Sequence, residues 1–148
     1  MAVLNDCMTD IKNQIDALSL SDLGDNNVVI RKAPWDLERN RIHTGITVHL
    51  PLQEHELPGT NSCDDIVYPI MVTVIRGTGG SELDNMARLG TWRQKIRREF
   101  INQRLSTVVS VYTCRIKFGR VLLPKQYRDN YDATTMAILC VSRETRGN

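Results

Sequence analysis

The fold is decided by the segment Ile66-Val67-Tyr68-Pro69-Ile70-Met71-Val72-Thr73-Val74-Ile75, which is almost continuously apolar. A strand with one solvated face alternates apolar and polar residues, whereas a strand covered on both faces does not. We therefore predict a central strand over Ile66 to Ile75. The segment is shorter than the roughly 20 residues of a membrane span, so we expect no membrane-spanning helix.

The elements before this strand follow from the spacing of apolar residues. Between Asp6 and Leu20 these residues recur at steps of three and four, which predicts a helix with one buried face. Val28 to Ala33 is a short apolar segment stopped by Pro34, and we predict a strand there. From Ile42 to Leu50 apolar and polar residues alternate, so this second strand is expected to have one face in solvent.

After the central strand, Ser81 is placed to cap a second helix, which we expect to run to about Leu105. Gly90 lies inside it. Two further strands are predicted over Val108 to Phe118 and over Ala133 to Val141. In the first of these, strict alternation places Tyr112 on the buried face.

The predicted order is therefore helix, three strands, helix, two strands. Helices combined with a mainly antiparallel sheet form a two-layer α+β domain. We predict two helices packed on a mainly antiparallel sheet of about five strands. A chain of 148 residues is long enough to bury one core, so we expect a single domain over 1–148.

Two loops stand out between these elements. Residues 52–65 have no apolar period and contain Pro58-Gly59-Thr60-Asn61-Ser62, which predicts a long exposed acidic loop. Residues 119–130 are predicted to form a basic loop between the last two strands. Charge is also divided along the chain. Residues 1–80 hold six Lys/Arg and eleven Asp/Glu, a formal −5, whereas residues 81–148 hold thirteen and six, a formal +7.

The second helix combines an apolar stripe with several arginines. Trp92, Ile96 and Phe100 recur at steps of four, so this stripe is expected to lie on the sheet. Three arginines fall beside it on a helical wheel: Arg93, Arg97 and Arg104. Arginines at the rim of a buried face either meet carboxylates within the domain or reach a neighbouring molecule.

The sequence carries no motif of an enzyme or of a metal site. His43 and His49 share a predicted strand face but lie about 20 Å apart, too far to bind one ion. His55 and Cys63 in the acidic loop lack the spacing of metal ligands. The glycine-rich segment 76–81 lacks the lysine of a phosphate-binding loop, which favours a hinge. We expect no catalytic residue, metal or cofactor, and no enzymatic activity.

Four cysteines lie far apart in the sequence without a Cys-x-x-Cys pair: Cys7, Cys63, Cys114 and Cys140. Two of them, Cys114 and Cys140, fall within predicted apolar strands. Buried, reduced thiols are the favoured interpretation. The first residues lack the basic and then apolar pattern of a signal peptide, so we expect synthesis in the cytoplasm.

The basic residues of the second half allow two interpretations. Those of the second helix could follow a phosphate backbone, and five of them lie between 88 and 98: Arg88, Arg93, Lys95, Arg97 and Arg98. No known nucleic-acid-binding motif accompanies them. Clustered arginine is also enriched at protein interfaces. A protein-binding surface is favoured, and a small nucleic-acid-binding accessory protein is the alternative.

The order of elements around Tyr68-Pro69-Ile70-Met71-Val72-Thr73-Val74-Ile75 resembles that of the tail-terminator and tail-completion proteins of tailed bacteriophages. The resemblance rests on layout, chain length and the lack of enzyme motifs. It implies a structural virion protein, without cofactor, whose copies form a ring, a hexamer in that family. The ring would terminate the tail tube and join it to the neck, with tail-tube and neck proteins as partners. A head-completion or neck connector protein is the closest alternative.

For such a ring we predict that acidic residues of one subunit dock on basic residues of the next, because opposite charges favour a head-to-tail contact. The predicted interface residues are Glu54, Glu56, Asp64, Asp65, Arg93, Arg97, Arg104, Arg120, Lys125 and Arg128.

Overall fold

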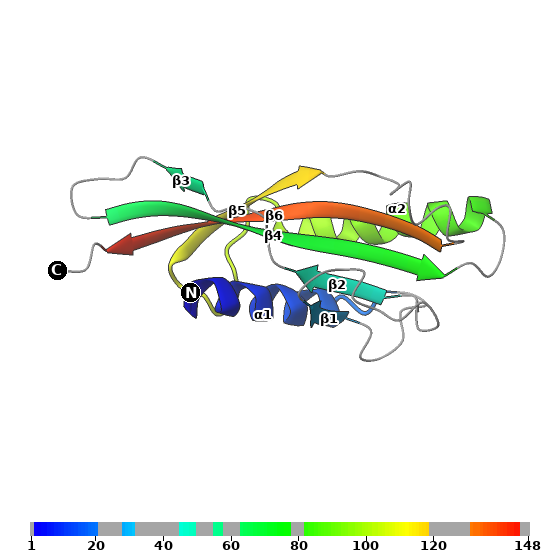
Figure 1. Cartoon of the computed structure of the whole chain (residues 1–148), viewed down its shortest axis with the longest axis horizontal. Coiled ribbons are helices and arrows are strands. Elements are labelled where there is room, and N and C mark those ends of the chain that lie inside the picture. Colours follow the sequence, from blue (N-terminus) through cyan, green and yellow to red (C-terminus); the bar gives the residue numbers. More distant parts are fainter. Residues whose placement is uncertain are drawn as a thin grey trace.

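The computed structural model describes residues 2–20, 28–31, 45–49, 55–57, 63–77, 82–118 and 131–145. They form helices and strands in the order α1 (Ala2–Ala17), β1 (Val28–Arg31), β2 (Gly45–His49), β3 (His55–Leu57), β4 (Cys63–Gly77), α2 (Glu82–Phe100), β5 (Val111–Phe118) and β6 (Tyr131–Thr145). The predicted α+β class is confirmed, with two helices on a mostly antiparallel sheet (Figure 1).

The sheet is built on two long strands. β4 and β6 are each 15 residues long and pair over their full length, from Cys63 opposite Thr145 to Gly77 opposite Tyr131. The strand order is β1-β2-β4-β6-β5, and β3 pairs with β4. Among the described strands only β1 and β2 are parallel. The predicted central strand is therefore confirmed as the middle of the sheet, and it is longer than its apolar segment.

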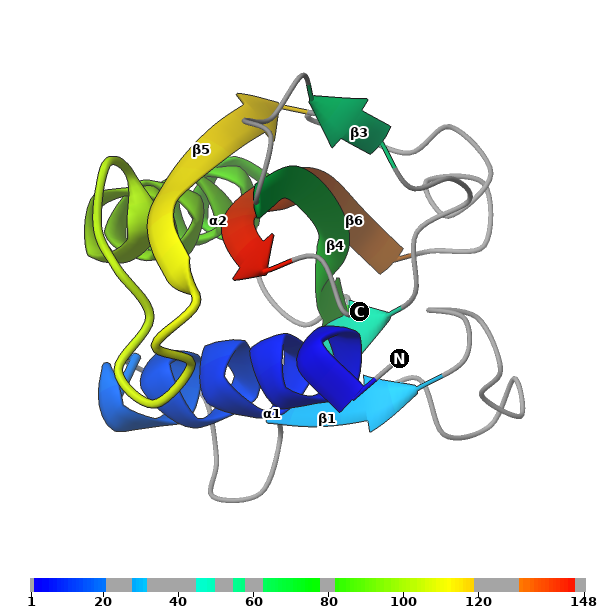
Figure 2. The same cartoon turned by 90° about the vertical axis from the view of Figure 1, so that its left-hand side faces the viewer.

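Both helices cover the same face of this sheet. One hydrophobic cluster joins α1 and α2 to alternate residues of the long strands, such as Ile70 and Val72 of β4 and Ile138 of β6. α1 lies along β1 and β2, while α2 lies over β6, β5 and β4 (Figure 2). The stripe predicted for the second helix is confirmed, because its three apolar residues are completely buried: Trp92, Ile96 and Phe100.

The helices end differently from the prediction. α1 spans Ala2–Ala17 and α2 ends at Phe100, five residues before the expected Leu105. Each helix is followed within two residues by a left-handed residue, Ser19 with φ 47° and Asn102 with φ 57°. This conformation closes helix ends and is more often taken by glycine. Neither position is a glycine, although asparagine, as at 102, is the next most common residue there, and these helix ends were not predicted.

Two predictions about exposure are wrong. β2 is buried on both faces, since Thr47 and His49 are 3% and 8% exposed instead of facing solvent. His49 Nε2 lies 2.8 Å from Thr73 Oγ1 of β4, which satisfies both polar groups. The acidic segment 52–65 is not wholly a loop either. It contains β3, and its last three residues begin β4.

Candidate interaction site

Charged and hydroxyl side chains gather where β4 begins, β6 ends and β5 begins. This end of the long strands extends beyond the start of α1 (Figure 1). Asp65 of β4 is directly opposite Arg143 of β6, although 78 residues separate them. Cross-strand neighbours of opposite charge stabilise an antiparallel pair. We name this group the sheet-end cluster; it comprises Asp65, Tyr68, Ser110, Tyr112, Ser142, Arg143 and Glu144.

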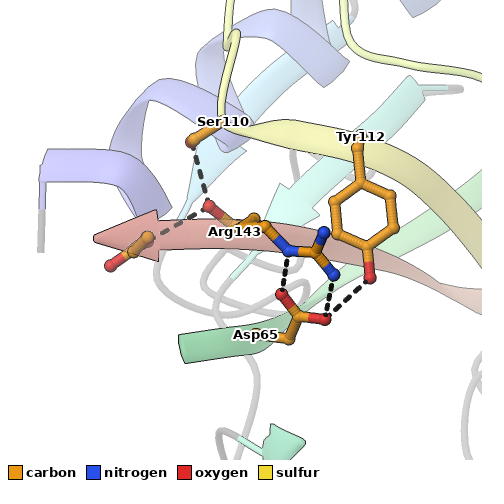
Figure 3. Close-up of polar contacts among 6 residues, drawn as sticks. Asp65, Ser110, Tyr112 and Arg143 are labelled. Atoms are coloured by element: carbon orange, nitrogen blue, oxygen red, sulfur yellow. Dashed lines mark hydrogen bonds and ion pairs between the residues drawn. The ribbon is translucent and has the colours of Figure 1, made fainter. Parts of the chain in front are cut away.

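The centre of the cluster is a two-bonded ion pair. Arg143 Nε donates to Asp65 Oδ1 at 2.8 Å, and a terminal nitrogen of Arg143 donates to Oδ2 at 2.9 Å (Figure 3). Tyr112 Oη donates a third bond to Oδ2 at 3.1 Å. The guanidinium also lies 5.1 Å from the centre of the Tyr112 ring. These contacts hold three side chains from three strands in one arrangement.

The same contacts determine the protonation of Asp65. Its pKa lies below the ordinary value of 3.8, chiefly because Arg143 donates hydrogen bonds to the charged form. The pKa of Arg143 is raised by the same bonds. Both groups are therefore charged at neutral pH. A carboxylate held in this state cannot supply a proton as a general acid.

On the helix-covered side, hydroxyl groups connect β6 to the segment before β5. Ser142 Oγ lies 2.9 Å from Ser110 Oγ and 3.2 Å from Glu144 Oε1. Tyr68 Oη donates to the same Glu144 oxygen at 2.8 Å. The main-chain nitrogen of Arg143 donates to the Ser110 carbonyl at 2.9 Å. This network holds the end of β6 against the connection that leads from α2 to β5.

A β-bulge orients Tyr112 toward the ion pair. Val111 pairs with Ser142 and Thr113 pairs with Val141, so Tyr112 is an extra residue in β5. An extra residue shifts the alternation of the strand by one. Val111 is consequently buried and Tyr112 is 36% exposed, whereas strict alternation had placed Tyr112 on the buried face. No signal in the sequence marks the bulge, because its residues are ordinary strand formers.

Among the described residues, the most exposed large apolar side chain lies in the connection before β5. Val109 is 93% exposed. Nearby, the buried carboxylate of Asp10 accepts a 2.9 Å hydrogen bond from the main-chain nitrogen of Thr107. Gln14 Nε2 donates to its other oxygen at 3.3 Å. The first helix therefore holds this connection in position, a role of Asp10 that sequence reasoning missed.

The predicted basic residues of α2 separate in the structure. Arg93 is only 9% exposed and donates to Thr134 of β6 through a terminal nitrogen, and burial lowers its pKa. Arg97 is half-buried, and Arg104 is exposed beyond the end of the helix. Arg93 thus bonds to a threonine hydroxyl inside the domain, whereas a carboxylate was the partner considered there for these arginines.

The predicted acidic residues also separate. Asp65 is 9% exposed and bound to Arg143, so the expectation of an exposed position is wrong for it. Asp64 is half-buried and opposite Glu144, while Glu56 pairs with Ile66 through the main chain of β3. Four predicted interface residues lie outside the described residues: Glu54, Arg120, Lys125 and Arg128.

Within the ranges that the structure describes, no three His, Cys, Asp or Glu side chains could together hold a metal ion. Cys7, Cys114 and Cys140 are buried free thiols, as predicted for the last two. The sulfurs of Cys114 and Cys140 are 3.9 Å apart, and the pKa of Cys140 is raised, first by its hydrogen bond with Cys114. A thiol that resists ionisation is a poor nucleophile and a poor metal ligand.

No protein-family model matches the chain, and no curated protein matches it significantly. In the described part of the chain, neither helix is long and apolar enough to cross a membrane.

Proposed function

We propose that this chain is a non-enzymatic structural protein of a tailed bacteriophage, whose copies form a ring that terminates the tail tube and joins it to the neck. One observation carries the proposal: at one end of the sheet an exposed apolar residue lies three positions before a tyrosine that contacts an arginine. These residues are Val109, Tyr112 and Arg143. A head-completion or neck connector protein is the alternative, since it would need a similar contact.

The composition of this end is that of a protein interface. Tyrosine and arginine are enriched at such interfaces, and an apolar side chain near the centre usually supplies much of the binding energy. Val109 is 93% exposed and the Arg143 side chain is 54% exposed. The hydrogen bonds that Arg143 and Tyr112 donate to Asp65 already fix both side chains, so little side-chain freedom would be lost on contact.

The order of elements gives further support. The described residues follow the predicted order with β3 added, and that order is the basis of the resemblance to tail-terminator proteins. The charge contact predicted between subunits needs revision, because Asp65 and Arg93 are bound within the domain. We propose that Val109 and Tyr112 form the centre of the contact and that surrounding charges steer it.

The test is the mass of the purified protein by light scattering. The parent should give a discrete multiple of 16.8 kDa. Val109→Asp should give a folded monomer, because a charge would have to be buried in the contact. Val109 is too exposed for this change to affect the fold, which circular dichroism would verify.

The matched control is Ile30→Asp. Ile30 is also an exposed apolar residue, 43% accessible, but it lies on β1 at the far edge of the sheet. This variant should assemble like the parent. A parent that remains monomeric at high concentration, or a Val109→Asp variant that still forms the parent's oligomer, would contradict the proposal.

A further inference from the structure

The outer side of α2 is a second surface, and it differs in composition from the sheet end. Its exposed cations lie at 88, 95 and 98. Residues three and seven positions apart lie on neighbouring parts of a helix surface, and these three span about 15 Å along the helix axis. Arg104 continues the positive charge past the end of the helix. We name Arg88, Lys95, Arg98 and Arg104 the α2 basic stripe.

This surface lacks an apolar centre. Among residues 87–104 every exposed side chain larger than alanine is basic or a neutral polar group. The neutral polar ones are Thr91, Gln94, Asn102 and Gln103. Trp92 and Phe100 are completely buried, so this helix offers no aromatic side chain to a partner. Protein interfaces normally have a buried apolar or aromatic centre, and this stripe has none.

The side chains exposed on this surface are of the kinds that bind a phosphate backbone. Its contacts come from Lys and Arg together with hydroxyl and amide side chains. Duplex DNA carries one charge for about every 1.7 Å of its axis, so a stripe of this length faces several phosphates at once. Binding of single strands usually adds aromatic stacking, which is absent from the described surface of α2.

We infer that the α2 basic stripe binds the phosphate backbone of duplex DNA without regard to sequence. Lys95 and Arg98, the two stripe residues changed below, lie on α2, whereas Val109 and Tyr112 lie in and before β5, so this inference does not depend on ring formation. Of the two interpretations of the basic residues, nucleic-acid binding is now favoured for α2. Arg93 is buried, and no exposed apolar side chain larger than alanine accompanies the exposed cations.

The experiment is a fluorescence-anisotropy titration of the full chain with a labelled duplex of random sequence at several salt concentrations. With about three phosphate contacts, the logarithm of the affinity should fall against the logarithm of salt with a slope near −3. The double variant Lys95→Glu/Arg98→Glu should bind at least about tenfold more weakly at low salt, with a slope smaller by about 2.

The matched control is Arg115→Glu/Lys117→Glu, which makes the same change in net charge at two exposed positions of β5. It should bind the duplex nearly as well as the parent. Equal losses in both double variants would overturn the assignment to α2, as would a parent without duplex affinity at low salt.

Two competitors test the chemistry of the ligand. Unlabelled single strand should compete less well than duplex, and polyglutamate should compete poorly. If polyglutamate displaces the duplex as readily as DNA does, the stripe binds acidic protein and the inference fails. Light scattering of the same variants separates this result from ring formation, because the stripe variant should assemble like the parent.

Discussion

The sheet end and the outer side of α2 are both rich in arginine, but the arginines have different surroundings. At the sheet end Arg143 is bound by Asp65, lies against Tyr112 and has the exposed Val109 at the same end. On α2, Arg98 is exposed, and the other exposed side chains of residues 87–104 larger than alanine are basic or neutral polar. The first combination suits a protein partner and the second suits a phosphate backbone. Arginine content alone therefore does not identify a partner; the neighbouring apolar groups do.

The largest expected difference between the two surfaces is in how salt concentration affects binding at each of them. For about three phosphate contacts, a fourfold rise in salt lowers duplex affinity about fortyfold. A contact centred on Val109 depends on burial of apolar area, which moderate salt hardly affects. Anisotropy measures the duplex affinity and light scattering measures the assembly, on the same samples. Assembly that dissociates over this salt range together with the DNA complex would show that charge governs both surfaces.

Two arginines of α2 provide the next comparison. Arg93→Ala should lower the free energy of unfolding by about 2 kcal/mol, because it removes a buried side chain and its bond to Thr134. Arg98→Ala should change it by less than about 0.5 kcal/mol, since Arg98 is exposed. Urea denaturation measures both values. Equal stabilities for the two variants would refute the inward role of Arg93.

Tyr112→Phe tests whether assembly depends on the hydrogen bonds that hold the side chains of the sheet end in place. The change keeps the ring and removes the hydroxyl that donates to Asp65. We expect a slightly lower urea midpoint and weaker assembly, with unchanged duplex binding. Concentration-dependent light scattering gives the assembly constant. Tighter assembly after loss of the hydroxyl would argue against a pre-organised contact.

The smallest effect expected is on acid stability. The pKa of Asp65 is lower in the folded state than in the unfolded chain, so the ion pair stabilises the fold above the unfolded value of about 3.9. This contribution is lost as the pH falls through the lower, folded pKa. Asp65→Asn should therefore be less stable than the parent at neutral pH, and the difference should shrink as the pH falls below about 4. Urea midpoints at several pH values measure it.

Sequence reasoning recovered the elements better than the contacts between them. The central strand, the stripe of α2 and the α+β class all follow from the spacing of apolar residues within short segments. Arg93 was correctly placed at the rim of a buried face, yet its partner Thr134 is 41 residues away. Local spacing shows which side of an element is buried, but it contains no information about which distant element lies opposite.

In the candidate site, too, the contacts between distant elements were not predicted. In the sequence, Asp65 and Arg143 were only two separate charges, and Asp65 was assigned to an exposed loop. Tyr112 was assigned to the wrong face because one extra residue in β5 changes its alternation. A bulge depends on how two strands are paired, so a single strand read alone does not reveal it.

The sequence by itself determined the class of the fold, the middle of the sheet, the buried side of α2 and the uneven distribution of charge. These properties depend on residues near one another in the chain, where the periods of helix and strand apply. The tertiary structure decided which charges are buried inside the domain and which remain exposed. The register between β4 and β6 pairs Asp65 with Arg143, the packing of α2 turns Arg93 inward, and the remaining exposed cations lie on one side of that helix.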